Sequence, residues 1–175
     1  MPGFSFGPKI DWGGYYLIVF LTTLAKSFVM ERRMQQVFLS GAISPDFIAG
    51  SIAEHQANTQ IGAHDIFLGQ VRADVINGKT VSAIEYTAYE EMANVKFNEI
   101  RETAFEKFEI TGMHIYHSLG SVHVGEICLF VFVSSPHRKT AFAALQHVVE
   151  EIKSQVPVFG KEHFEDDSYQ WKVNT

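Results

Sequence analysis

The feature that most constrains the fold is a strand that leads directly into a long amphipathic helix. Residues 126–133 form an apolar, strand-like run, and Ser135 and Pro136 follow with the chemistry of an N-cap and a first helical residue. The helix is expected to end near Gln155, because the residue after it precedes a proline and is restricted to extended backbone. Apolar residues at helical spacing define its buried face: Ala141, Leu145, Val148, Val149 and Ile152, with Phe142 beside them.

Basic side chains at both ends of this helix predict a phosphate site. His137 and Arg138 lie in the first turn, where unpaired backbone N–H groups and the helix dipole favour an anion. Their positive charge opposes the dipole there, a cost that is sensible if an anion binds. Lys153 lies in the last turn, and Lys161 follows after a short extended segment. Each residue taken alone is also typical of a solvated surface charge or, for Lys153, of a cation at a helix C-terminus.

Length, charge and composition narrow the possible functions. The chain has 175 residues, enough for one domain with its own core, and a net charge of −6. Without residues 1–33 it carries ten basic and eighteen acidic groups, so nucleic-acid binding, which neutralises many phosphates, is not predicted. The single Cys128 excludes an intrachain disulfide and a cysteine-cluster metal site. His114 and His117 lie three apart on a predicted strand and face opposite ways, so no metal site is predicted.

Residues 1–33 do not resemble the rest of the chain. Their apolar run, residues 15–25, is eleven residues long and falls short of the ~20 needed to span a bilayer, so no membrane association is predicted. A signal peptide is disfavoured by Asp11 beside Lys9 and by the lack of a small-residue cleavage site. The preferred interpretation is an over-extended start, with translation beginning at Met34. An export or anchor segment and an ordered extension are the alternatives.

The remaining residues, 34–175, are predicted to form one α+β domain. Hairpin signals mixed with separate helices favour this class over a doubly wound α/β fold. An Asn77-Gly78 turn is the strongest hairpin signal in the chain, and it is expected to join the predicted strands over Gln60–Asp74 and Lys79–Tyr89 as a hairpin. The expected helices are Pro45–Ala57, Glu90–Phe108 and the amphipathic helix above, and the expected strands are Gln36–Ser40, Gln60–Asp74, Lys79–Tyr89, Met113–Leu119, Val122–Val124, Glu126–Val133, Phe159–Phe164 and Tyr169–Val173.

Several short motifs together resemble a known family. In chain order they are FLGQVR (67–72), IEYTAY (84–89) with Met92-Ala93, HSLG (117–120), Gly125-Glu126, His137-Arg138 with Ala141-Phe142, and VPVFGKE (156–162). This set resembles the large, catalytic subunit of molybdopterin synthase over about Val37 to Trp171. The resemblance implies an α/β-hammerhead-type single domain with antiparallel hairpins and three helices, and a cytoplasmic enzyme of molybdenum-cofactor biosynthesis.

The resemblance also implies a reaction and a partner. The family is a sulfurtransferase that adds two sulfurs to cyclic pyranopterin monophosphate and so forms molybdopterin with its dithiolene, without a bound cofactor. The sulfur comes from a thiocarboxylate on the C-terminal Gly-Gly tail of a small ubiquitin-like subunit. A chain whose single cysteine lies inside an apolar strand is poorly equipped to carry the sulfur itself, which agrees with an external donor.

Matching positions carry the family's site residues over to this chain. Lys153 corresponds to the central catalytic lysine, which meets the partner's tail and stabilises developing charge. The family pattern has a second lysine directly after the aromatic of V-P-x-aromatic; here that position is Gly160 and the lysine is Lys161, one residue later on an extended segment and so on its other face. The implied catalytic residues are Lys153 and Lys161, and the implied substrate-binding residues are Gln70, Val71, Arg72, His137, Arg138, Lys153, Gly160, Lys161 and Glu162.

The spacing along the amphipathic helix predicts a dimer. His137 and Lys153 are sixteen residues apart, about 24 Å along one helix, which a single pterin does not span. If both act on one substrate they come from two copies of the chain, so we expect a homodimer with composite sites and a small subunit at each end, two large and two small chains in all. The rival functions are a non-catalytic phosphate- or pterin-binding module and a scaffold that binds a ubiquitin-like tail.

Overall fold

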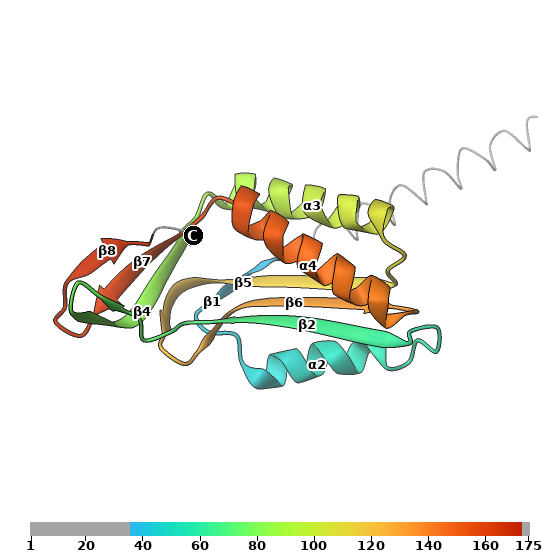
Figure 1. The fold of residues 1–175 in the computed structure, drawn as a ribbon, viewed down its shortest axis with the longest axis horizontal. Coiled ribbons are helices and arrows are strands. Elements are labelled where there is room, and N and C mark those ends of the chain that lie inside the picture. Colours follow the sequence, from blue (N-terminus) through green and yellow to red (C-terminus); the bar gives the residue numbers. More distant parts are fainter. Residues whose placement is uncertain (1–35, 173–175) are drawn as a thin grey trace, which may run out of the picture. The chain divides into compact units, whose positions relative to one another are not determined.

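The computed structural model describes residues 36–172 of the chain, which form one compact unit (Figure 1). The interpretation of residues 1–33 as a leader lies outside the described residues, as does the last residue of the predicted tail strand, Val173. The helices are α2 (Pro45–His55), α3 (Glu90–Lys107) and α4 (Arg138–Gln155), and the strands are β1 (Phe38–Ser40), β2 (Ala63–Gln70), β3 (Val75–Ile76), β4 (Lys79–Ala88), β5 (Gly112–His123), β6 (Ile127–Ser135), β7 (Val158–Phe164) and β8 (Tyr169–Trp171). None of these helices is long and apolar enough to cross a membrane.

The strands form one mostly antiparallel sheet in the order β2-β6-β5-β4-β7-β8, with β3 beside β4 and β1 parallel to β5. Strand β5 changes partner along its length. Its first part, residues 112–117, pairs with β6, and its last part, residues 120–123, pairs with β4. The change falls at Gly120, whose φ of +81° is readily reached only by glycine. Through this switch β4, β7 and β8 continue the sheet beyond the end of β6.

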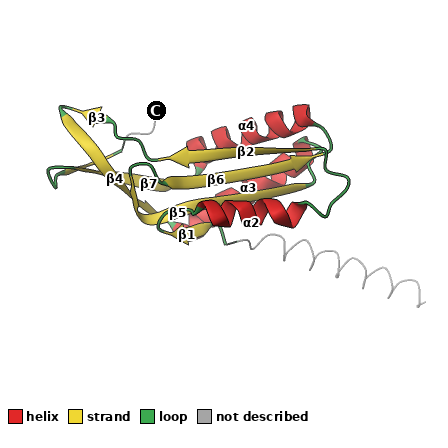
Figure 2. Ribbon diagram, turned by 90° about the horizontal axis from the view of Figure 1, so that it is seen from below, coloured by secondary structure: helices red, strands yellow, loops and turns green. Residues whose placement is uncertain are grey.

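Helices cover both faces of the sheet. Figure 1 shows α3 and α4 on one face and α2 on the other, and Figure 2 shows α2 across the near face when the molecule is seen from below. Strand β6 serves both layers because its side chains alternate: Leu129 and Val131 belong to the core under α3 and α4, whereas Phe130 and Phe132 pack with Ile48 of α2. All four β6 residues are fully buried, so β6 is the centre of the domain. The predicted α+β class with three helices and antiparallel hairpins is confirmed for the described residues.

Local signals place several elements correctly. The Ser44 hydroxyl accepts a hydrogen bond from the Phe47 N–H at 3.2 Å and caps α2 as predicted. Asn77 and Gly78 both have positive φ and form the tight turn between β3 and β4. The face of α3 that packs on the core consists of Ala93, Phe97, Ile100 and Ala104. Strands β7 and β8 form where the two tail strands are predicted and pair antiparallel.

The predicted pairing of the strand over Gln60–Asp74 with the strand over Lys79–Tyr89 is wrong. Strand β2 pairs antiparallel with β6 along its whole length, and only the two-residue β3 pairs with β4 through the Asn77-Gly78 turn. The register shifts at Gly69/Gln70, and Val71 then bonds the β5–β6 turn through Glu126 O and Gly125 N. This bulge takes residues 71–74 out of the ladder and separates two strands that the sequence joins.

The predicted start of the amphipathic helix is also wrong, by two residues. Ser135 is the last residue of β6 rather than an N-cap, because it still pairs with Ala63 of β2. Helix α4 begins at Arg138, with His137 in extended geometry as its N-cap. The Ser135 hydroxyl nevertheless accepts a hydrogen bond from the His137 N–H at 3.2 Å. The predicted end at Gln155 is confirmed.

The buried face of α4 differs from the predicted one in three positions. Val149 is only half-buried, and Phe142 is 57% exposed and does not join the core. Ala144, which the pattern missed, is fully buried because it faces the sheet on the same side as Ala141.

Candidate functional site

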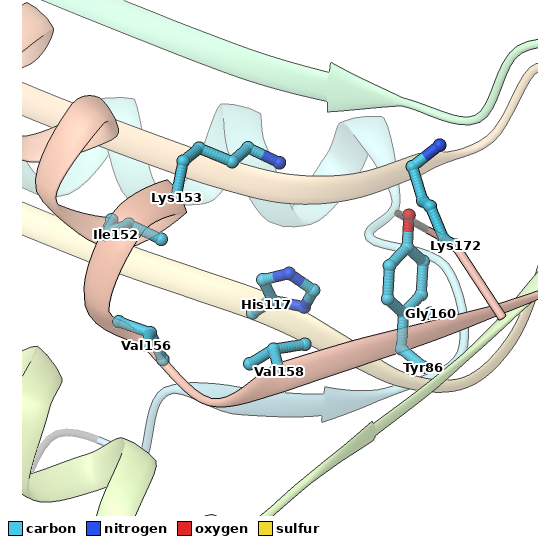
Figure 3. Close-up of a pocket in the computed structure, with 8 residues that line it drawn as sticks. All are labelled: Tyr86, His117, Ile152, Lys153, Val156, Val158, Gly160 and Lys172. Atoms are coloured by element: carbon cyan, nitrogen blue, oxygen red, sulfur yellow. The ribbon is translucent and has the colours of Figure 1, made fainter. Parts of the chain in front are cut away.

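A pocket lies where α4 ends over the sheet (Figure 3). The last turn of α4 and the segment after it form one wall, β4, β5 and β7 supply the floor, and the residue following β8 closes the far side. We call this the Lys153 pocket. Its lining consists of Tyr86, His117, Ile152, Lys153, Val156, Val158, Gly160 and Lys172. Helix α4 ends here because Val156 is forced to extended backbone, with φ −83° and ψ 126°, before Pro157.

A larger groove adjoins the Lys153 pocket and shares Tyr86, Lys153 and Lys172 with it. Its volume of about 340 Å³ is within the range of about 300–1,000 Å³ that small-molecule sites take. We call it the Arg72 groove. Its other lining residues come from the end of β2 and the segment after it, and from β4, β6 and β7: Phe67, Leu68, Gly69, Gln70, Arg72, Asp74, Ile84, Cys128 and Glu162. Five predicted site residues therefore line the groove or the adjoining pocket: Gln70, Arg72, Lys153, Gly160 and Glu162.

Two ammonium groups reach this surface from opposite sides. Figure 3 shows Lys153 extending from the end of α4 over the pocket and Lys172 on the opposite side, beside Tyr86. Among residues 36–172, no side chain pairs with the Lys153 ammonium. The Lys172 ammonium lies 2.9 Å from Glu162 Oε1, and the Gln170 amide donates to Glu162 Oε2 at 2.8 Å. Glu162 is only 3% exposed; the Lys172 ammonium compensates its charge, and the Gln170 amide hydrogen-bonds its other oxygen.

His117 lies on the floor of the Lys153 pocket and is neutral near pH 7. Burial lowers the pKa of its imidazole to about 4; the hydrogen bond to the Ser118 carbonyl acts against this shift, and the charge of Lys153 adds to it. A carbonyl only accepts, so Nδ1 carries the hydrogen and donates to Ser118 O at 2.9 Å. In the neutral ring Nε2 is then an acceptor. The histidine can accept a hydrogen bond at Nε2 without adding a competing positive charge to the pocket.

Tyr86 links the pocket to the cysteine. Its hydroxyl donates to Cys128 Sγ at 3.3 Å, and the Cys128 thiol donates to Gly69 O at 3.3 Å. Burial raises the pKa of the Tyr86 phenol, with the neighbouring Cys128 as the next cause. The Tyr86 phenol is therefore neutral, both groups are hydrogen-bonded, and the predicted burial of Cys128 is confirmed.

The remaining predicted residues of this region lie in different surroundings. Arg72 is at the rim of its groove, where its 77% exposed side chain pairs with Asp74 at 3.0 Å. Val71 is in the core, its backbone bonds Gly125 and Glu126, and it lines neither cavity. Lys161 lies outside both cavities, 3.6 Å from Glu85 and 4.1 Å over the Tyr169 ring.

His137 and Arg138 line a separate, open pocket at the other end of α4. We call it the His137 pocket; it is lined by Gly62, Pro136, His137, Arg138, Lys139 and Thr140. The 18 residues of α4 extend about 27 Å at 1.5 Å per residue. Within one chain, therefore, His137 and Arg138 are not brought together with Lys153.

Sequence reasoning missed Lys172, Tyr86 and His117 as site residues. Tyr86 and His117 lie inside the IEYTAY and HSLG motifs, but nothing local marks them as pocket residues. Lys172 could have been found from the register of the tail hairpin. Glu162 pairs with Gln170, and Lys172 N donates to Gly160 O at 2.8 Å. His114 and His117 do face opposite ways, and no group of three His, Cys, Asp or Glu in residues 36–172 could hold a metal ion.

An α+β domain with a cationic pocket at a helix C-terminus is the class of protein that the geometry defines. The family described as MoaE protein matches residues 43–155, and the chain belongs to this family. It is 37% identical over 121 residues to the molybdopterin synthase catalytic subunit of Aspergillus fumigatus, a match that covers 69% of this chain and 64% of that protein. The chain thus matches just under two thirds of the length of this fungal relative.

Solved structures give the same result. Molybdopterin synthase from Staphylococcus aureus superposes with a TM-score of 0.70 at 33% identity, covering 80% of this chain and 98% of that one. A chain from the protein-protein complex of subunits 1 and 2 of the molybdopterin-converting factor of Helicobacter pylori superposes with a TM-score of 0.66 at 19% identity, covering 77% and 87%. At that identity the second likeness concerns the fold alone.

Proposed function

We propose that this chain is the catalytic subunit of a molybdopterin synthase of the cytoplasm. It would transfer two sulfurs from a thiocarboxylated, ubiquitin-like small subunit to cyclic pyranopterin monophosphate and so form the dithiolene of molybdopterin. The observation that carries the proposal is the Lys153 pocket: an ammonium without a partner among the described residues faces a cavity in a chain of this family. The substrate and the thiocarboxylate are both anions, which an unpaired cation attracts.

The chemistry of the pocket suits a transfer of sulfur from an outside donor. In each transfer the thiocarboxylate sulfur forms a bond to a side-chain carbon of the pterin, a carbon–oxygen bond of that carbon breaks, and its oxygen substituent leaves. Water then attacks the acyl carbon of the resulting thioester, the tail's carbon–sulfur bond breaks, the tail leaves as a carboxylate, and the sulfur stays on the pterin as a thiol. Negative charge develops on sulfur and oxygen, and the Lys153 ammonium is placed to stabilise it. Because His117 is neutral, Lys153 rather than His117 interacts with this developing negative charge. Cys128, bonded to Tyr86 and Gly69, has no part as a sulfur carrier.

The proposed assembly has two copies of this chain and two small subunits. His137 and Arg138 are separated from Lys153 by the length of α4, and their own pocket contains none of the residues of the Arg72 groove. In a dimer with twofold symmetry, the His137 pocket of each copy would lie next to the Lys153 pocket of the other copy, so that the two pockets form one site. The Helicobacter pylori chain, which is similar in fold, comes from a complex of subunits 1 and 2, and by analogy with it we propose a small partner for this chain.

Reconstitution tests the function. The full chain would be combined with a thiocarboxylated small subunit and cyclic pyranopterin monophosphate, and dithiolene product measured. Lys153→Ala is expected to lower the rate about 10²–10³-fold, the usual effect of removing one group that stabilises developing charge. Lys96→Ala is the matched control, because Lys96 pairs with Glu99 on the surface of α3.

The rival functions predict different outcomes of the same experiment. A non-catalytic pterin- or phosphate-binding module would bind the pterin and yield no dithiolene even with the unaltered chain. A scaffold for the ubiquitin-like tail would bind the small subunit and leave the pterin unbound. Full activity of Lys153→Ala would contradict the role proposed for the lysine.

A further inference from the structure

The Lys153 pocket contains a second lysine that no family motif of the sequence marks. Members of the family resembled by this sequence carry a lysine directly after the aromatic of V-P-x-aromatic, where this chain has Gly160. We propose that Lys172 supplies the second ammonium of the site in place of a lysine at position 160, and that Lys161 does not. This inference rests on the proposed function, because it assigns a further substrate-contacting residue to the same site.

The side chain of Lys172 and a side chain at position 160 would occupy the same part of the Lys153 pocket. The two residues are neighbours across the tail hairpin, where Lys172 N donates to Gly160 O at 2.8 Å. A Cβ added to Gly160 would lie 3.5 Å from both Cβ and Cδ of Lys172. The stem of Lys172 therefore runs alongside the path that a side chain at position 160 would take. Both residues line the Lys153 pocket (Figure 3).

Strand geometry keeps Lys161 out of the pocket. Successive residues of β7 point to opposite faces, so Gly160 and Glu162 share the pocket face and Lys161 points away from it. On that other face Lys161 is held by Glu85 at 3.6 Å and lies over the Tyr169 ring. The hydrogen bond from His163 and the charge of Lys161 lower the pKa of the Glu85 carboxyl, which keeps this pair charged. Lys161 thus has a structural role where it is.

Glu162 holds the Lys172 ammonium in position. The buried carboxylate is 2.9 Å from Lys172 Nζ and is fixed on its other oxygen by Gln170. An ammonium has three donors, so at least one is left for a ligand after Glu162 has accepted one. The two lysines therefore differ in what they offer: Lys153 brings a charge with no counter-ion among the described residues, and Lys172 brings a directed hydrogen-bond donor whose charge is largely balanced.

The space beside Gly160 determines whether a lysine at position 160 could take the place of Lys172. A Cβ at this position would be 3.0 Å from the Ile84 Cγ2 methyl in addition to its contacts with Lys172. The two 3.5 Å distances to Lys172 are ordinary van der Waals contacts, and the Ile84 methyl must move by a few tenths of an ångström to admit a side chain at position 160. This geometry predicts a rescue variant. When Lys172 is replaced by a shorter or neutral residue, Gly160→Lys should again place an ammonium group in the Lys153 pocket.

The experiment uses the reconstituted complex of the full chain with its thiocarboxylated small subunit. Lys172→Gln is the main variant, because glutamine keeps a hydrogen-bond donor for Glu162 and so protects the buried carboxylate. We expect at least a tenfold loss in the rate of dithiolene formation, and at least a fivefold recovery in Lys172→Gln/Gly160→Lys. Lys161→Gln is the competing variant, and Lys96→Gln is the surface control. Thermal unfolding of each variant accompanies the assay.

The outcomes separate this inference from the function on which it rests. Loss with Lys172→Gln and recovery with the double variant support it, since a merely structural lysine would not be replaced by an amine from a different strand. Wild-type rates with Lys172→Gln, or a larger loss with Lys161→Gln, overturn it while leaving the synthase function intact. If Lys172→Gln unfolds, Gly160→Lys/Lys172→Ala takes its place, and an inactive but folded double variant counts against the proposal. Absence of dithiolene from the unaltered complex contradicts the function itself.

Discussion

The two ends of α4 differ in how completely one chain builds a site around its basic residues. At the C-terminal end, Lys153 faces Lys172, Tyr86 and His117 across a cavity with a buried carboxylate beside it. At the N-terminal end, His137 and Arg138 border an open surface with only their own neighbours and Gly62. The contrast agrees with the proposed assembly, in which the C-terminal end of α4 forms most of one site and the N-terminal end contributes His137 and Arg138 to the site of another copy.

The largest expected effect comes from mixing two inactive variants. Lys153→Ala and Arg138→Ala homodimers should each be nearly inactive if every site takes Lys153 from one copy and Arg138 from the other. Unfolding and refolding them together should return about a quarter of wild-type dithiolene formation, because half of the random dimers are mixed and each mixed dimer has one intact site of two. Recovery well below this level in a verified mixture would mean that both residues act within one chain or that they serve different sites.

The next effect is the pH dependence of stability that is expected from His117, in the Lys153 pocket at the C-terminal end of α4. The pKa of His117 is lowered to about 4 from an ordinary 6.5, so between pH 6.5 and pH 4 the unfolded chain binds the proton more readily than the folded one. The free energy of unfolding should therefore fall as the pH drops through this window, by about 3 kcal/mol for this histidine at 1.36 kcal/mol per pH unit.

His117→Asn isolates this contribution. Asparagine keeps a donor for the Ser118 carbonyl but does not titrate, so its denaturant-measured stability should depend less steeply on pH. His114, whose pKa is also lowered to about 4 by burial, titrates in the same window and remains in both proteins, so the difference between them reports His117. Parallel pH curves would show that His117 does not titrate as described.

A smaller effect compares serines at the two ends of the helix. Ser135 is fully buried, and its hydroxyl bonds the His137 N–H and the Glu109 carbonyl. Ser135→Ala should lower the free energy of unfolding by about 1–2 kcal/mol and raise KM for the pterin, because it loosens the turn that carries His137. Ser154→Ala is the matched control: Ser154 bonds only carbonyls of its own helix at an exposed position, so a change below about 0.5 kcal/mol is expected. Equal changes at the two positions would argue against a special role for the N-terminal turn.

The smallest effect is expected at the rim of the Arg72 groove. Asp74→Asn removes the surface partner of Arg72, and exposed ion pairs of this kind contribute about 0–1 kcal/mol, so stability should hardly change. The freed guanidinium should bind an anion more readily, and KM for the pterin should fall severalfold with kcat unchanged. A rise in KM would show that Asp74 itself contacts the substrate or positions Arg72 for it.

The same helix shows what could be predicted and what could not. The predicted end at Gln155 is correct, because Pro157 restricts the backbone of the residue directly before it and so stops the helix there. Its start was misplaced because Ser135 and Pro136 have N-cap chemistry, yet the ladder between β2 and β6 continues through Ser135. Long-range pairing prevailed over a local capping preference. The missing hairpin between β2 and β4 has the same cause, since the partner of β2 lies more than fifty residues away in sequence.

The sequence by itself determined the α+β class, the position of Lys153 in the last turn of α4 and the separation of Lys153 from His137. These depend on helical periodicity, a proline and a fixed rise per residue, all of which act locally. Only the tertiary structure decided that Lys172, rather than Lys161, shares the pocket with Lys153, and that Arg72 and Glu162 border the same surface. The reason is physical: which side chains meet across strands depends on register and bulges, and these are settled by packing between segments distant in sequence.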